Sequence, residues 1–134
     1  MSALPKAETD TAPKRVLVVE DDVLIRHVIA QAMRDAGLFV VEAGSGTAAM
    51  GYLGSGAPVD VVFSDIEMNG ADDGLRLAHD IRAGFPDIPV ILTTGSAMPS
   101  YLADADAFIA KPYQISSVLE LVTKTLGVTR DGAE

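Results

Sequence analysis

Short continuous runs of apolar residues alternate with segments of helical periodicity along this 134-residue chain. The run at residues 16–19 (VLVV) has no polar position, and such a run indicates a strand that is buried on both faces. The segments between the runs repeat apolar side chains at intervals of three and four, as expected for helices that cover a sheet. Strands alternating with helices are joined by right-handed crossovers, so the pattern predicts a parallel sheet with helices on both faces.

The order of these segments narrows the fold further. The expected strands lie at residues 16–19, 39–41, 59–64, 90–93 and 108–110. The expected helices are marked by apolar residues at 25–33, 47–53, 75–81 and 115–126. We expect the first helix to end at Gly37, the third at Gly84 and the last at Gly127. Five strands in a chain of this size favour an α/β, flavodoxin-like (βα)5 three-layer sandwich with sheet order 2-1-3-4-5.

The composition fits one domain with one core, because 49% of the residues are hydrophobic. Residues 1–13 are polar and contain Pro5 and Pro13, so we expect a flexible N-terminal tail. The domain would cover residues 14–127, and residues 128–134 would form a short polar tail. The sequence has no cysteine, which excludes a disulfide framework and a zinc–thiolate site.

Charge and hydropathy limit the classes of partner. The net charge is −9, whereas binding to phosphate backbones needs a basic surface. No apolar segment approaches the length of a membrane span, and the N-terminus lacks the apolar run of a secretory signal. We therefore expect a soluble, cytoplasmic protein with no direct nucleic-acid or membrane partner.

Acidic residues follow two strands that are neighbours in the expected sheet. Glu20, Asp21 and Asp22 follow the first strand, and Asp65 follows the third. Ligands of open α/β sheets bind beyond the carboxyl ends of the strands at the switch point, which here lies between these two. Clustered acids raise one another's pKa unless a cation intervenes, and oxygen ligands without cysteine or histidine suit Mg²⁺. Asp22 is expected to cap the first helix instead.

A hydroxyl and an ammonium group follow the last two strands. Thr94 stands at the end of the fourth strand, and Lys111 follows the fifth and precedes Pro112. An acid cluster, a hydroxyl donor and a lysine around Mg²⁺ together describe a phosphoryl site.

Four motifs occur in order, each at a strand end: VLVVEDD, SDIEMNG, IPVILTTG and FIAKPY. With this ordered set the sequence resembles the receiver (CheY-like) domain of two-component response regulators over about residues 14–127. The combination of GLRLAHDIR, PDIPVILTTGS and KPY is particularly similar to single-domain receivers common in alphaproteobacteria.

The resemblance implies a role for each member of the acid cluster. Asp65 would be the phosphoacceptor and, with Asp21, a direct ligand of Mg²⁺. Glu20 would act on the metal through water, and the backbone carbonyl of Glu67 would complete the protein ligands.

The resemblance also implies the switch. Lys111 would pair with the phosphoryl group, and Thr94 would donate its hydroxyl to a phosphoryl oxygen and move inward. Phe108 would then turn from exposed to buried. Side chains at Glu67 and Ser96 would flank the path of the hydrolytic water, and we hypothesise that Glu67 alters the phosphoryl lifetime through its charge.

The implied function is phosphorylation-activated signalling. Asp65 would take a phosphoryl group from a phosphohistidine on a histidine kinase or a histidine phosphotransfer protein. The surface around the last two strands and the last helix would change, and a downstream protein of unknown identity would read it. The chain would be a stand-alone response regulator or a phosphorelay shuttle, and would catalyse only its own phosphorylation and dephosphorylation.

Other readings of the sequence stay open. The chain could be a receiver fragment of a hybrid histidine kinase. It could be a pseudo-receiver that binds proteins without carrying phosphate, although the retained acids, Thr94 and Lys111 argue against this. A Mg²⁺-dependent phosphatase would need a general acid and a substrate pocket, and the sequence offers no convincing candidate for either.

The sequence departs from the family pattern in two places. Between Thr94 and Lys111 it is shorter than most relatives by a little more than one helical turn, and the remainder holds Pro99. We therefore expect the fourth helix to be absent, shortened or mobile. Asn69 stands where proline is commonest, and the bond from Lys111 to Pro112 is expected to be cis, as is usual in the family.

Overall fold

The computed structural model describes residues 12–69, 73–96 and 104–131, together with the side chains of these residues up to Gly127. The strands are β1 Arg15–Val19, β2 Phe39–Ala43, β3 Val61–Asp65, β4 Val90–Thr94 and β5 Ala107–Ala110. The helices are α2 Val23–Asp35, α3 Gly46–Gly54, α4 Asp73–Gly84 and α5 Ile115–Asp131.

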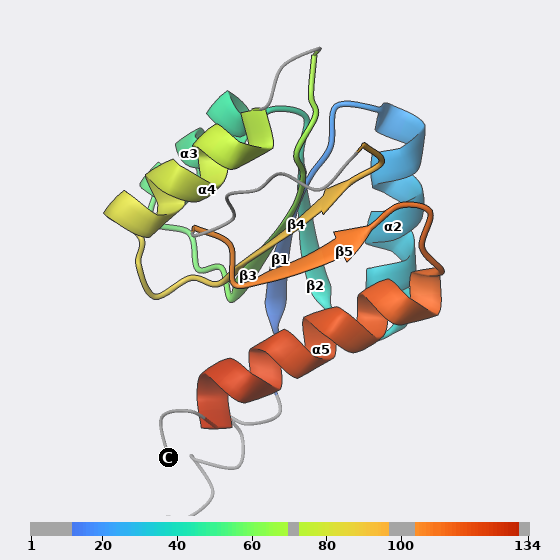
Figure 1. Cartoon of the computed structure of the whole chain (residues 1–134). Helices are drawn as coiled ribbons and strands as arrows, with labels where there is room; N and C mark the ends of the chain where they lie inside the picture. The colour runs from blue at the N-terminus through green and yellow to red at the C-terminus, as the bar shows by residue number, and fades with distance from the viewer. Residues whose placement is uncertain (1–11, 70–72, 97–103, 132–134) are drawn as a thin grey trace, which may run out of the picture.

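All five strands are parallel and lie in the order β2-β1-β3-β4-β5, which confirms the predicted flavodoxin-like topology. Figure 1 shows α3 and α4 together on one face of the sheet and α2 and α5 on the other. In the described part of the chain, no helix is both long and apolar enough to cross a membrane.

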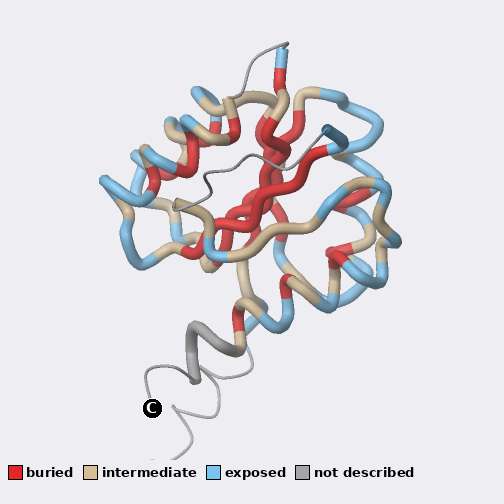
Figure 2. The backbone as a smooth tube through the Cα atoms, viewed as in Figure 1, coloured by how far each residue is buried: buried red, intermediate tan, exposed pale blue. Residues whose placement is uncertain are grey.

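Two apolar clusters, one on each face, hold these layers together. Leu17 and Val19 point to the α3/α4 face and pack with Leu77, whereas Val16 and Val18 point to the α2/α5 face. The strands are therefore buried on both sides, as their continuous apolar runs predicted, and Figure 2 shows the buried residues concentrated along the sheet.

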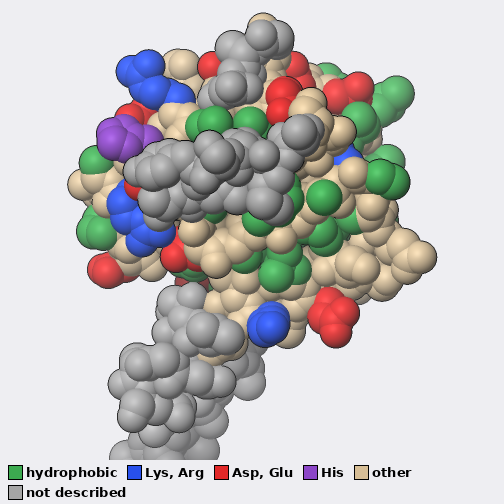
Figure 3. Space-filling model, in the orientation of Figure 1, with side chains coloured by type: hydrophobic (Ala, Val, Ile, Leu, Met, Phe, Trp, Pro, Cys, Tyr) green, Lys and Arg blue, Asp and Glu red, His purple; other side chains and the backbone are tan. Residues whose placement is uncertain are grey.

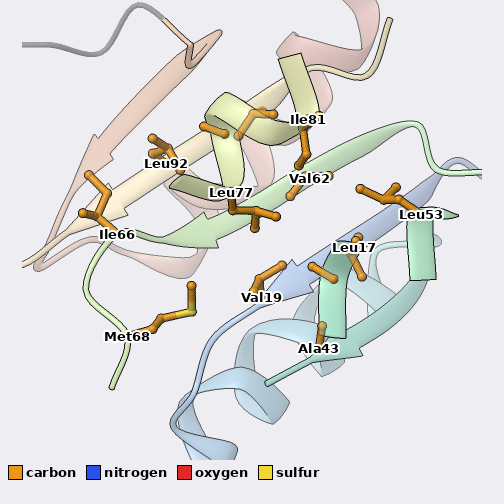
Figure 4. Close-up of a cluster of buried hydrophobic side chains, with 13 residues drawn as sticks. Leu17, Val19, Ala43, Leu53, Val62, Ile66, Met68, Leu77, Ile81 and Leu92 are labelled. Atoms are coloured by element: carbon orange, nitrogen blue, oxygen red, sulfur yellow. The ribbon is translucent and has the colours of Figure 1, made fainter. Parts of the chain in front are cut away.

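The cluster on the α3/α4 face extends past the end of β3. Ile66 and Met68 follow Asp65 and are 1% exposed each, and Figure 4 shows both beside the other members of this cluster. Alternate residues of the loop are thus buried, which fixes the position of Glu67 between them.

Helix ends follow the local signals in one case and not in another. Asp22 caps α2 as predicted, because its side chain accepts a hydrogen bond from the Ile25 N–H at 3.0 Å. Gly37 follows the helix with φ of +95°, the left-handed conformation typical of a C-terminal glycine. The prediction that Gly127 ends the last helix is wrong, since α5 continues to Asp131. Glycine inside a helix costs about 1 kcal/mol, which neighbouring residues can offset.

The apolar pattern of α2 marks the helix correctly but not its buried face. Ile29 and Met33 are buried, whereas Ile25 and Val28 are exposed. The predictions for the N-terminal tail and for the fourth helix fall mainly on residues 1–11 and 97–103, which lie outside the described residues.

Candidate functional site

Asp65 is the last residue of β3 and lies beside Thr93 of β4. It is 6% exposed although it carries a carboxylate. Its Oδ2 accepts a hydrogen bond from the Lys111 Nζ at 3.1 Å. Its Oδ1 is buried and has no hydrogen-bond partner among the described residues. Buried oxygens without a partner are costly, so this atom marks a place where a further group can bind.

Lys111 reaches the end of β3 from the loop after β5. Its Nζ lies 3.1 Å from Asp65 Oδ2 and 3.7 Å from Glu20 Oε1. Burial lowers the pKa of Lys111, but the hydrogen bond to Asp65 and the attraction of both carboxylates outweigh it, so the pKa is raised above its usual value. The lysine therefore stays charged, and the bond before Pro112 is cis, as expected.

The two acids after β1 have opposite environments. Glu20 is 5% exposed, and burial is the largest cause that raises its pKa to about 7. Asp21 accepts a hydrogen bond from the Asn69 N–H at 2.8 Å, and this bond is the largest cause that lowers its pKa. At neutral pH Asp21 is ionised, while Glu20 is divided between its neutral and charged forms.

An arginine on α2 holds the loop that carries these acids. The Arg26 Nη1 donates to the backbone oxygen of Glu20 at 2.9 Å, and its Nε donates to Glu42 at 3.1 Å. Gly44 leaves space for this side chain, since a Cβ there would lie 3.1 Å from the arginine Nη1. We call these contacts the Arg26 brace. The sequence shows both charges but not that β2 and α2 bring them together.

The loop after β3 depends on a glycine and an asparagine. A Cβ on Gly74 would collide with the backbone oxygen of Asp65 and lie 2.6 Å from the Ile66 Cα. The Gly74 N–H also donates to the Ile66 oxygen at 2.9 Å. Asn69 has φ of 55°, in the left-handed region that asparagine tolerates and proline cannot enter. Asn69, at a position where proline is commonest in the family, thus suits the observed backbone.

Thr94 ends β4 and is fully buried. Its hydroxyl lies within hydrogen-bond reach of both carboxylate oxygens of Glu67, at 2.6 Å from Oε1. The Ser96 N–H donates to the same hydroxyl oxygen at 3.0 Å. Sequence reasoning assigned separate roles to these residues and did not predict that they contact one another.

The sequence that builds this site matches a known protein family. Residues 16–123 match the family described as the response regulator receiver domain. The chain belongs to this family.

Relatives of this receiver domain support the same assignment. It is 35% identical over 116 residues to the DNA-binding transcriptional regulator NtrC of Salmonella typhimurium, covering 83% of this chain and 24% of the relative. The receiver thus spans about a quarter of that relative's length.

Two solved structures resemble the receiver over nearly all of their own length. The response regulator TrrA of Thermotoga maritima, in complex with Mg²⁺-BeF, has a TM-score of 0.75 and 32% identity, covering 83% of this chain and 97% of that one. The receiver domain of the hybrid histidine kinase CckA has a TM-score of 0.71 and 32% identity, covering 84% and 98%.

The receiver brings most of its predicted site residues to one edge of the sheet. Lys111 contacts Asp65 and lies 3.7 Å from Glu20. Other acidic side chains are exposed along the upper edge of the molecule in Figure 3. Ser96 is exposed. Phe108 lies on the edge strand β5, partly buried against the cluster of the α3/α4 face.

The donor set of the receiver fits a hard divalent cation. No group of three histidine, cysteine, aspartate or glutamate side chains that could enclose a metal occurs within the described ranges. The predicted Mg²⁺ site needs fewer than three such side chains in direct contact with the ion, since it combines the carboxylates of Asp21 and Asp65 with a backbone carbonyl. The unpartnered Oδ1 of Asp65 is an oxygen donor of the kind that Mg²⁺ prefers.

Proposed function

We propose that this receiver accepts a phosphoryl group on Asp65 from a phosphohistidine in a Mg²⁺-dependent reaction. The donor is a histidine kinase or a histidine phosphotransfer protein, and the receiver acts in the cytoplasm as a response regulator or phosphorelay shuttle. The observation that carries the proposal is the state of Asp65: one carboxylate oxygen pairs with Lys111, and the other is buried without a partner.

The chemistry follows from these contacts. A carboxylate oxygen of Asp65 forms a bond to phosphorus while the bond from phosphorus to the histidine nitrogen breaks, and the electron pair returns to the imidazole. The ammonium of Lys111 lies 3.1 Å from the nucleophile, where it stabilises negative charge on the phosphoryl oxygens. The chain therefore acts by positioning and by electrostatics, and only on its own phosphorylation and dephosphorylation.

Four groups would hold the magnesium ion. They are the carboxylates of Asp21 and Asp65, the backbone carbonyl of Glu67, and Glu20 through water. When bound, the ion neutralises charge among the acids and the phosphoryl oxygens. The Asn69 hydrogen bond keeps Asp21 ionised and oriented for this role.

The response would begin at Thr94 and Phe108. The Thr94 hydroxyl donates to a phosphoryl oxygen, and Phe108 moves into the space that opens beneath it. This changes the surface of β4, β5 and α5, which a downstream protein reads. A coupling free energy of about 1–3 kcal/mol is typical of such two-state systems. The net charge of −9 supports a protein partner over direct nucleic-acid binding.

Glu67 and Ser96 would set the lifetime of the phosphoryl group. Both positions would flank the path of the hydrolytic water, and the charge of Glu67 would alter its approach. We expect the dephosphorylation rate to change in Glu67→Gln and Glu67→Asn. Equal lifetimes in the three proteins would exclude this role.

A receiver fragment of a hybrid histidine kinase is the second candidate. The likeness to the receiver domain of CckA, a hybrid histidine kinase, favours it. Retention of phosphate after transfer from a kinase domain in the same polypeptide would support this alternative. The contact between Asp65 and Lys111 argues against a pseudo-receiver, which has no need of it.

Intact-mass measurement tests the proposed reaction. The wild type and Asp65→Ala are incubated with acetyl phosphate and Mg²⁺, and separately with a phosphorylated histidine phosphotransfer protein. We expect a mass gain of one phosphoryl group in the wild type alone, lost when EDTA is present. An equal gain in Asp65→Ala, or none in either protein, would refute the proposal.

A further inference from the structure

The hydroxyl of Thr94 already has an acceptor inside the protein. A threonine hydroxyl has one proton, and here Glu67 accepts it at 2.6 Å. The Ser96 N–H occupies one lone pair of the same oxygen at 3.0 Å. Because Thr94 is fully buried, water does not compete for this proton. Hydrogen bonds to a charged acceptor are about twice as strong as neutral ones, so the arrangement holds the hydroxyl firmly.

The phosphoryl group needs the proton that Glu67 holds. Thr94 directly follows Thr93, the neighbour of Asp65 in the sheet, and Glu67 lies two residues beyond Asp65 on the loop. A phosphoryl group on Asp65 adds up to about two negative charges at a residue only two positions from Glu67. It therefore competes for the hydroxyl proton and also repels the carboxylate that holds it.

We propose that the Glu67 carboxylate is an internal competitor of the phosphoryl group, which holds the Thr94 hydroxyl in the unphosphorylated state. We call this contact the Glu67–Thr94 latch. Activation requires the hydroxyl to exchange one anionic acceptor for another. The latch rests on the proposed function, and it assigns Glu67 a positioning role distinct from its charge effect on the hydrolytic water.

The latch also holds Ser96, the second residue after β4. The Ser96 N–H depends on the Thr94 hydroxyl oxygen for its hydrogen bond. When the hydroxyl turns toward the phosphoryl group, Ser96 must follow it or lose this partner. Release of the latch thus moves the first residues after β4, on the side of the molecule where the proposed readout begins.

Beryllofluoride affinity tests the latch without any turnover. Beryllofluoride with saturating Mg²⁺ is titrated by calorimetry into the wild type, Glu67→Ala, Thr94→Val and the double variant. Loss of the internal competitor should tighten binding about tenfold in Glu67→Ala, or ~1.4 kcal/mol. In the Thr94→Val background, which has no hydroxyl to release, Glu67→Ala should change the affinity less than about twofold, or ~0.4 kcal/mol.

Two conservative variants separate the latch from general electrostatics. Thr94→Ser keeps the hydroxyl and should preserve the tenfold effect of Glu67→Ala. Glu67→Gln keeps a neutral acceptor, so its affinity should lie between those of the wild type and Glu67→Ala. Thermal unfolding of each variant, and the amide resonance of Ser96 without ligand, show whether the site remains folded.

Each outcome decides a different question. Equal tightening in the Thr94 and Thr94→Val backgrounds would mean that Glu67 acts by charge alone, and the latch would be wrong. No tightening in either background would also refute it. If the folded wild type does not bind beryllofluoride at all, the proposed function fails and the latch, which rests on it, fails with it.

Discussion

The two halves of the site are held in place by different means. On the β1 side, the Arg26 brace joins α2, β2 and the backbone of Glu20 through two hydrogen bonds from one guanidinium group. On the β4 side, the Thr94 hydroxyl donates its one proton to Glu67 and accepts the Ser96 N–H. In the first half, both contacts of Arg26 go to groups that take no part in the proposed reaction, the Glu20 carbonyl and the Glu42 carboxylate. The second depends on a hydroxyl proton whose acceptor must change in the proposed reaction.

This difference matches what each half has to do. The acids that would hold a metal need the same geometry before and after phosphorylation, so redundant contacts to backbone are an advantage. A switch needs two states that differ by only a few kcal/mol. A hydroxyl proton that can be donated to either of two competing acceptors provides two such states. Loss of the Arg26 brace should therefore cost more stability than loss of the Glu67–Thr94 contact.

The largest effect is expected at the junction between β3 and α4. Gly74→Ala places a Cβ against the backbone of Asp65 and Ile66, which cannot move without disturbing the buried loop. We expect a loss of about 3 kcal/mol in the free energy of unfolding, measured with urea. The matched control is Gly51→Ala on α3, where a Cβ meets nothing within 4 Å and should stabilise by up to about 1 kcal/mol. Equal effects would contradict the close approach.

A smaller effect is expected when the Arg26 brace is removed. Arg26→Ala leaves the Glu20 carbonyl without this donor and Glu42 with fewer cations, and should cost about 1–2 kcal/mol in urea unfolding. Arg26→Lys keeps the charge but cannot make both hydrogen bonds. Its stability and Mg²⁺ affinity should therefore lie between those of the wild type and Arg26→Ala.

The control for the brace is an exposed arginine of the same charge. Arg76→Ala removes an ion pair of 3.6 Å to Asp80 on the surface of α4, and should change the stability by less than about 0.5 kcal/mol. If Arg26→Ala has no more effect than this control, the two halves of the site do not differ as described.

A further effect is a pH dependence that comes from Glu20. Its pKa is about 7 in the folded protein, against 4.5 for an ordinary glutamate. The folded state therefore binds more protons between these values, and stability falls as pH rises from about 4.5 to 7. We expect Glu20→Gln, in EDTA, to remove this part of the slope in urea unfolding. If stability depends on pH equally in the wild type and in Glu20→Gln, this pH dependence does not come from Glu20.

Much of the fold was predictable because its signals are local. Continuous apolar runs indicated strands buried on both faces, and Asp22 and Gly37 mark the ends of α2 by hydrogen bonding and by φ. The end of α5 was not predictable from Gly127, since a glycine can stay helical where the surrounding helix supports it. The exposure of Ile25 and Val28 was also missed, because periodicity does not say how far a neighbouring element extends.

The sequence alone determined which residues stand at the carboxyl ends of the strands, because the topology follows from the order of strands and helices. It thereby placed Asp65, Glu20 and Lys111 at one edge. Only the tertiary structure decided which side chains form hydrogen bonds or ion pairs with one another. The Thr94 hydroxyl donates to Glu67 at 2.6 Å and the Arg26 Nε to Glu42 at 3.1 Å, each between residues of different elements or loops, and no local pattern encodes these contacts.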